Sequence, residues 1–304
     1  GTHCHFSDGS ANSCYLGEAF TCIGQGPFLD RPIQHEVMFD AMIPWLDYWL
    51  KDDCEAWNGL TNYLTTPNAS FDIQTNCMET CAANNGVLVQ AKAHLEGAFN
   101  GVDMNTGLLD SSILPTNQPY NRSPWNYTGT EMTTNTSANA VDWVLLEARS
   151  AGDINVIVET KAALLLNDGT IVDANGSANG VLFNDLTENG SYGFVVRHRN
   201  HLDVMSSNTL AVPNTTAYDF GVPANVMLGA SQLKDVGNGV FALFAGDNDG
   251  NGVFTVNDYN VYIAESAALN SYEDSDCNLN AAVEVSDFNL YVPNASVSGV
   301  TQIR

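Results

Sequence analysis

The chain has 304 residues, and its 10 basic and 35 acidic residues give a formal net charge of −25. So acidic a chain repels nucleic acids and anionic lipid surfaces, which excludes both as favoured partners. No apolar run reaches the about 18 residues of a membrane-spanning helix, so we expect no membrane span. Clustered carboxylates favour the binding of calcium ions instead.

Cysteines dominate the first part of the chain. Six of the seven fall within the first 81 residues, and an even, local cluster predicts three disulfides and an oxidising, extracellular compartment. The predicted disulfide cysteines are Cys4, Cys14, Cys22, Cys54, Cys77 and Cys81. A zinc site near Cys4 is the alternative, but no C-x-x-C pair accompanies it. Cys277 lies far from the others, and we expect it to be free or to link two chains.

Residues 1–85 are expected to form a cysteine-rich helical segment. The sequence IQHEVMFDAMIPWLDYWLK, residues 33–51, has apolar side chains every four positions and predicts an amphipathic helix that Pro44 bends or splits. This segment offers little else to cover the apolar stripe. We therefore expect it to pack on the following domain or on another chain.

Residues 86–238 are predicted to form an antiparallel β-sandwich, because apolar, β-branched segments alternate with turn signals such as NDG and ENG. In VDWVLLEAR the alternation places Val141, Trp143, Leu145 and Glu147 on one face. The Pro-rich stretch from 100 to 140 is either a docked loop or a flexible excursion. Its Trp125 and Tyr127 are candidates for carbohydrate stacking or for plugging the core.

A basic stretch closes this region. On a strand, Arg197, Arg199 and His201 would share one face. They could clamp an anion, but in so acidic a chain we favour cross-strand ion pairs with carboxylates such as Glu147 and Glu159.

Residues 239–304 contain the sharpest motif, DNDGNGVFTVND. A calcium loop of the EF-hand type places oxygen ligands at positions one, three, five, seven, nine and twelve, with glycine at position six for the turn. Gly252 occupies position six, and a short apolar helix is expected to follow. The ligand positions are Asp247, Asp249, Asn251, Val253 through its carbonyl, Thr255 and Asp258.

The pattern returns at residues 276–287. Its ligand positions are Asp276, Asn278, Asn280, Ala282, Glu284 and Asp287. Position six is Ala281 rather than glycine, which makes the turn costlier and leaves calcium occupancy of the second loop open.

Two such loops, each closed by aspartate and followed by a short helix, resemble the dockerin type I module. The resemblance implies a calcium-folded pair that either binds cohesins or caps a chain, and we favour the structural role. Together with segments such as YGFVVRHRNHL, residues 87–290 also resemble the C-terminal module of exported surface proteins of Bacteroidota. That second resemblance implies a β-sandwich before the calcium pair, and secretion.

The opening GTHCHF and the later PWLDYWLK resemble the C-terminal end of secreted α/β-hydrolases, in which His3 would match the catalytic histidine. That family places its serine and acid before the histidine, and no G-x-S-x-G motif occurs in this chain. The alternative function is therefore the C-terminal portion of a secreted esterase whose serine and aspartate lie upstream. As given, the chain carries no predicted catalytic residue.

Asn-x-Ser/Thr sequons fit an exported, glycosylated surface. They begin at Asn68, Asn121, Asn126, Asn135, Asn175, Asn189, Asn214 and Asn294. The sequence thus predicts an extracellular, calcium-stabilised structural or adhesive protein. We expect its partners to be further copies in an oligomer or filament, or an upstream fragment of the same precursor.

Overall fold

The computed structural model divides the chain into two units, Gly1–Asn85 and Gly86–Arg304. It describes residues 86–133, 138–174 and 180–303, together with Phe39, Asp40, 42–44, Leu46, Asp47 and Leu60. The described residues between 39 and 47 are helical, as the sequence predicts there. The six predicted disulfide cysteines and His3 lie outside the described residues.

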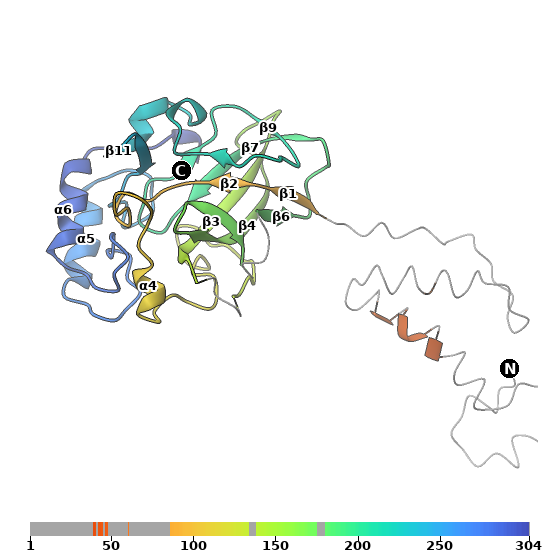
Figure 1. Cartoon of the computed structure of the whole chain (residues 1–304), viewed down its shortest axis with the longest axis horizontal. Helices are drawn as coiled ribbons and strands as arrows, with labels where there is room; N and C mark the ends of the chain where they lie inside the picture. The colour runs from red at the N-terminus through yellow and green to blue at the C-terminus, as the bar shows by residue number, and fades with distance from the viewer. Residues whose placement is uncertain are drawn as a thin grey trace, which may run out of the picture. The chain divides into compact units, whose positions relative to one another are not determined.

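The second unit is mainly β, which confirms the predicted fold class in its broad form (Figure 1). Its eight-stranded sheet follows the order β10-β2-β5-β4-β3-β7-β8, with β9 also paired to β7. Every pairing in this sheet is antiparallel except β10 with β2. The strands are β2 (Ala91–Lys92), β3 (Ala140–Ser150), β4 (Ile157–Leu166), β5 (Thr170–Asp173), β7 (Ser191–Arg197), β8 (Val204–Met205), β9 (Leu210–Ala211) and β10 (Tyr218–Asp219).

Two small antiparallel sheets and several short helices complete this unit. The small sheets pair β1 (Val87–Val89) with β6 (Val181–Phe183) and β11 (Leu233–Gly237) with β12 (Val240–Leu243). The helices are α4 (Gly107–Asp110), α5 (Val256–Glu265), α6 (Val285–Asn294) and the 3-10 turns η2 (Pro223–Asn225), η3 (Gly229–Gln232) and η4 (Thr301–Ile303). In Figure 1, α5 and α6 lie side by side at one edge of the unit.

The main core lies on the inner face of the large sheet. Val144 and Leu146 of β3 pack there with residues of both small sheets, such as Phe183 and Leu243. Successive side chains of a strand point to opposite faces of the sheet, so the apolar side chains on its inner face are removed from water together. This packing joins the three sheets into one hydrophobic core.

The outer face of β3 is covered by the Pro-rich stretch, which is therefore a docked loop over its described part. Tyr120 is completely buried and its hydroxyl donates to the Trp143 carbonyl at 2.6 Å. The indole Nε1 of Trp143 donates a hydrogen bond to the Pro115 carbonyl in the same loop, at 2.8 Å. These bonds satisfy the polar atoms of two large aromatic residues and hold the loop on the sheet.

Two expectations about strand faces are wrong. Val141 belongs to the inner core rather than to the face of Trp143, because the register between β3 and β4 shifts between Ala140 and Asp142. Strand β7 ends at Arg197, so Arg199 and His201 lie beyond it and do not share its face. Both predictions assumed that side chains alternate between faces every two residues. The irregularity in β3 and the end of β7 at Arg197 interrupt that alternation.

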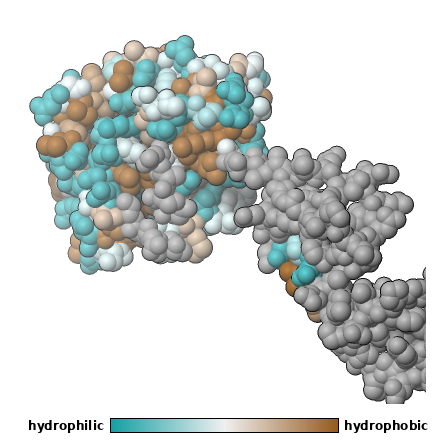
Figure 2. All heavy atoms as spheres, turned by 45° about the vertical axis from the view of Figure 1, so that its right-hand side comes forward, coloured by the Kyte–Doolittle hydropathy of each residue, from teal (hydrophilic) through white to brown (hydrophobic). Residues whose placement is uncertain are grey.

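The surface is mixed. On the face of the second unit in Figure 2, apolar residues form separate patches among hydrophilic ones. None of the helices in the described part of the chain is both long and apolar enough to cross a membrane.

Candidate metal centre

The first predicted calcium loop folds around the carboxylate of Asp247. Its two oxygens accept hydrogen bonds from the backbone N–H groups of Asn251, at 3.1 Å, and Gly252, at 2.9 Å. Gly252 has φ of 75°, the left-handed conformation that allows the chain to turn back toward Asp247. Helix α5 follows and begins with a capping box formed by Thr255 and Asp258.

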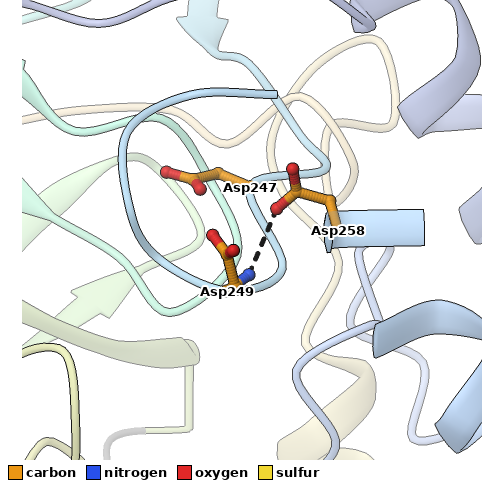
Figure 3. A group of neighbouring side chains, drawn as sticks. All are labelled: Asp247, Asp249 and Asp258. Atoms are coloured by element: carbon orange, nitrogen blue, oxygen red, sulfur yellow. Dashed lines mark hydrogen bonds between the residues drawn. The ribbon is translucent and has the colours of Figure 1, made fainter. Parts of the chain in front are cut away.

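Three carboxylates converge inside this loop (Figure 3). One oxygen from each of Asp247, Asp249 and Asp258 lies within 4.8 Å of the other two. Ligand oxygens lie about 2.3–2.6 Å from a calcium ion, so two that share one ion are at most about 5 Å apart. The spacing and the all-oxygen chemistry therefore fit one hard cation, and these three residues could hold it.

The loop carboxylates are costly to bury as anions. Burial raises the pKa of Asp247 well above its usual range, and the charges of Asp203 and Asp258 raise it further. Burial also raises the pKa of Asp258. A bound divalent cation would offset both the burial and the mutual repulsion of these groups.

The second loop repeats the first. Asp276 accepts from the N–H groups of Asn280 at 3.0 Å and Ala281 at 2.9 Å, and Asp287 accepts from Glu284 at 2.8 Å. Ala281 has φ of 67°, so alanine adopts the same left-handed turn that glycine makes in the first loop. Burial raises the pKa of Asp276 to about 6. Asn278 replaces the carboxylate of Asp249, so this loop carries less negative charge at its third position.

The two loops also touch. The Cys277 thiol donates to Asn248 Oδ1 at 3.2 Å, which joins the second position of one loop to the second position of the other. The helices that follow stack Tyr262 on Phe288, with ring centres 5.4 Å apart. Cys277 is a free, buried thiol in this structure, in line with the first of its two predicted states.

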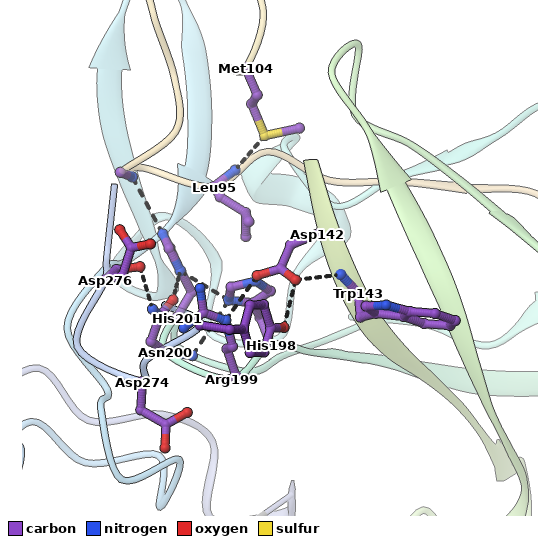
Figure 4. A network of polar contacts seen from close by, with 12 residues as sticks. Leu95, Met104, Asp142, Trp143, His198, Arg199, Asn200, His201, Asp274 and Asp276 are labelled. Atoms are coloured by element: carbon purple, nitrogen blue, oxygen red, sulfur yellow. Dashed lines mark hydrogen bonds and ion pairs between the residues drawn. The ribbon is translucent and has the colours of Figure 1, made fainter. Parts of the chain in front are cut away.

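A buried ionic network ties the second loop to the large sheet (Figure 4). Arg199 Nε donates to Asp142 Oδ2 at 2.9 Å, and both side chains are fully buried. The Tyr272 hydroxyl donates to Asp142 Oδ1 at 2.6 Å, and the Arg199 guanidinium lies 4.1 Å from the centre of the Tyr272 ring. Arg199 also donates to the Glu273 carbonyl. A residue after β7 thus contacts β3 and the segment that leads into the second loop.

Two buried histidines extend this network. His198 Nε2 lies 3.2 Å from Asp142 Oδ2, and His201 Nδ1 lies 2.7 Å from Asn200 Oδ1. The Gly97 N–H donates to His201 Nε2, so the His201 proton is on Nδ1. Asn200 in turn donates from Nδ2 to the Asp276 carbonyl at 2.8 Å. The segment that follows β7 therefore holds the backbone of Asp276, the first residue of the second loop.

Sequence reasoning identified part of this network. The predicted ion pair between Arg197 and Glu147 is confirmed, with Nε and Oε1 2.5 Å apart, but Arg197 also pairs with Asp203. Glu159 was predicted as an arginine partner, and that is wrong, since it pairs with Lys161. The role of Asp142 was missed. A carboxylate inside a strongly apolar strand is a signal that a buried cation must pair with it.

The predicted glycosylation sites differ in accessibility. Asn121, Asn126 and Asn189 are exposed, and these sequons remain predictions. The Asn214 amide donates to the carbonyls of Gln90 and Thr216. Asn294 is completely buried and donates to Glu96 and to the Ala245 carbonyl, so its prediction as a glycan site is wrong. The other sequons, at Asn68, Asn135 and Asn175, lie outside the described residues.

Comparisons with known proteins add little to this geometry. No protein family matches the chain, and no curated protein matches it either. A chain from the crystal structure of a type II cohesin–X-dockerin complex of Acetivibrio cellulolyticus, an N-terminal interface mutant, is similar over 51% of this chain and 82% of that chain. The identity is 14% and the TM-score 0.29, too low to argue a shared fold. The site itself must therefore carry the functional argument.

Proposed function

We propose that residues 86–304 form an extracellular structural or adhesive module that calcium stabilises through both loops. One observation carries the proposal: the loops around Asp247 and Asp276 repeat the same carboxylate-to-backbone hydrogen bonds, position by position. Two copies of the same left-handed turn around an aspartate carboxylate support a pair of cation sites, and in the first loop three carboxylates also converge.

Calcium suits these loops better than a softer metal. Every side-chain ligand is a carboxylate, amide or hydroxyl oxygen, and Val253 and Ala282 supply backbone carbonyls. Each loop has three carboxylates at its ligand positions, because Asn278 takes the place of Asp249 and Glu284 takes the place of Thr255. The first loop should bind more tightly because Gly252 makes its left-handed turn at lower cost than Ala281 does in the second.

The role of the ions is structural. Arg199 and Asn200 attach the second loop to the large sheet, and the thiol of Cys277 attaches it to the first loop. Free energy gained by binding calcium is therefore passed to the fold as a whole. Gly97 lies where these parts meet, because a Cβ on it would come within 1.9 Å of the Cys277 carbonyl oxygen.

The test is calcium-dependent melting of the full chain. Calcium should raise the melting temperature, since a ligand at about 100 times its Kd adds about 2.7 kcal/mol to the stability. Asp258→Asn should remove most of this gain and Asp287→Asn a smaller part. Asp185→Asn, in an exposed loop, is the matched control and should keep the full shift. Equal melting with calcium and with a chelator would refute the proposal.

Secretion and self-assembly belong to the same proposal but need a separate experiment. The exposed sequons and the acidic surface support an extracellular location, while Cys277, being buried, gives no support to assembly. Sedimentation velocity of the full chain in calcium should show species larger than a monomer. A single monomeric species at micromolar concentration would remove self-assembly and leave the calcium proposal intact.

A further inference from the structure

A hollow of about 400 Å³ opens on the outer face of the large sheet, beside the first loop. Its size lies within the range of about 300–1,000 Å³ that small-molecule sites occupy. The docked Pro-rich loop, strands β3, β4 and β7, and the first calcium-type loop all contribute to it. The lining residues used below are Trp125, Tyr127, Glu147, Ile157, Arg197 and Asp203.

The aromatic wall of the hollow is held in place before any ligand arrives. Trp125 packs edge-to-face on Tyr120 with ring centres 5.2 Å apart. Gly250 also comes so close that a Cβ on it would lie 2.7 Å from the indole ring of Trp125. The Tyr127 hydroxyl is within 3.0 Å of the Thr160 carbonyl and also bonds Glu131. Two rings fixed in this way offer preorganised apolar surfaces.

The polar part of the hollow is balanced in charge. Arg197 pairs with Glu147 and Asp203, and Arg149 pairs with Glu147 at 2.7 Å. Arg197 in the lining and Arg149 behind it thus pair with the two carboxylates of the hollow. A charged ligand would find no unpaired partner there, whereas a neutral group that both donates and accepts hydrogen bonds would fit between the pairs.

One polar atom at this wall is unsatisfied. Trp125 Nε1 is shielded from solvent and has no hydrogen-bond acceptor among the described residues. A buried N–H without an acceptor is costly, and such groups commonly mark a place where a ligand or water belongs.

From these observations we propose that the hollow binds a neutral sugar residue. The apolar face of a pyranose ring can lie on Trp125 or Tyr127, and its hydroxyls can bond the Glu147, Arg197 and Asp203 groups as both donors and acceptors. This inference goes beyond the calcium proposal and concerns a different site, to which the first loop contributes Gly250 and the predicted calcium ligand Asn251.

The test is ligand binding by the full chain. Glucose, galactose, mannose, xylose and N-acetylglucosamine, with their common β-linked disaccharides, are titrated by saturation-transfer difference NMR, in calcium and again in chelator. At least one neutral sugar should bind saturably in calcium, whatever chelation does to the first loop, and glucuronate should bind more weakly than glucose. Absence of saturable binding throughout the panel overturns the proposal, as does tighter binding of glucuronate than of glucose.

Two exposed neighbours provide matched variants. Ile157 is 47% exposed and lines the hollow, whereas Val156 is 50% exposed and does not. Ile157→Lys should weaken sugar binding about tenfold or more, and Val156→Lys should leave it within about twofold, with equal melting temperatures. Trp125→Ala should weaken binding about tenfold by removing the stacking surface. If Ile157→Lys and Val156→Lys bind equally well, the sugar lies elsewhere and the assignment fails.

Discussion

Arg199 donates a hydrogen bond from Nε to Oδ2 of Asp142 across 2.9 Å, and neither side chain is exposed to solvent. Burial alone would raise the pKa of Asp142, but Arg199, His198 and Tyr272 together lower it to about 2. The pair therefore stays ionised inside the protein. It joins strand β3 to the segment that enters the second calcium-type loop.

Removing the cation from this pair should destabilise the fold strongly. Arg199→Gln leaves Asp142 buried without its guanidinium, a change that typically costs about 3–5 kcal/mol. The measurement is urea unfolding of the full chain at neutral pH. The control is Arg122→Gln, because the pair of Arg122 with Asp274 is partly exposed and should contribute about 0–1 kcal/mol. Equal losses in the two variants would contradict the role assigned to Arg199.

The buried histidines should contribute stability that is lost on mild acidification. Burial lowers the pKa of His198, and burial with the nearby charges of His198 and Arg199 lowers that of His201 well below 6.5. Their contribution to stability is therefore complete above about pH 6.5 and is lost as the pH falls toward the folded-state pKa values. Each group adds a slope of at most about 1.4 kcal/mol per pH unit.

His201→Gln tests this assignment. Glutamine does not titrate, so acidification from just above to just below pH 6.5 should weaken the variant less than the parent chain. Burial raises the pKa of Asp203 to about 7 and that of Asp276 to about 6, and these carboxyls oppose the histidine effect in both proteins alike. The comparison uses urea unfolding free energies at each pH. The same pH dependence of the unfolding free energy in the variant and in the parent chain would contradict the prediction.

Gly97 should tolerate no side chain. A Cβ at Gly97 would meet the Cys277 carbonyl oxygen at 1.9 Å, and a backbone atom cannot move aside as a flexible side chain could. Gly97→Ala should cost at least about 1–3 kcal/mol, the usual range for overpacking. Gly152→Ala is the control, since its nearest neighbour would be 3.8 Å away, and its effect should stay within about 1 kcal/mol. Similar melting temperatures for the two variants would rule out the close approach.

The Cys277 thiol should be unreactive in the folded protein. Burial raises its pKa well above the usual range, so little thiolate forms near neutral pH. Mass spectrometry after iodoacetamide treatment should find Cys277 unmodified in native protein and alkylated after denaturation. Chelation of calcium should increase its labelling if the two loops loosen. Rapid alkylation of the native chain in calcium would show that the thiol is not buried between the loops.

The sequence by itself determined the local structures. The repeated spacing of oxygen-bearing residues from Asp247 and from Asp276 predicted two loops with helices after them, and apolar alternation predicted a mainly β unit. Both signals depend on short-range geometry, which neighbouring residues fix: a turn needs a left-handed residue, and a strand face repeats every two positions. Ala281 also adopts the left-handed conformation that the sixth position of the loop requires.

Only the tertiary structure decided how these parts join. Asp142, Arg199 and Tyr272 are far apart in the chain, and no local period brings them together; the register of β3 on β4 and the end of β7 at Arg197 do so. The same holds for Trp125 and Ile157, which meet at one hollow because the Pro-rich loop docks on the outer face of the sheet. Such partners are chosen by the free energy of burying charge and apolar surface, which depends on the whole fold.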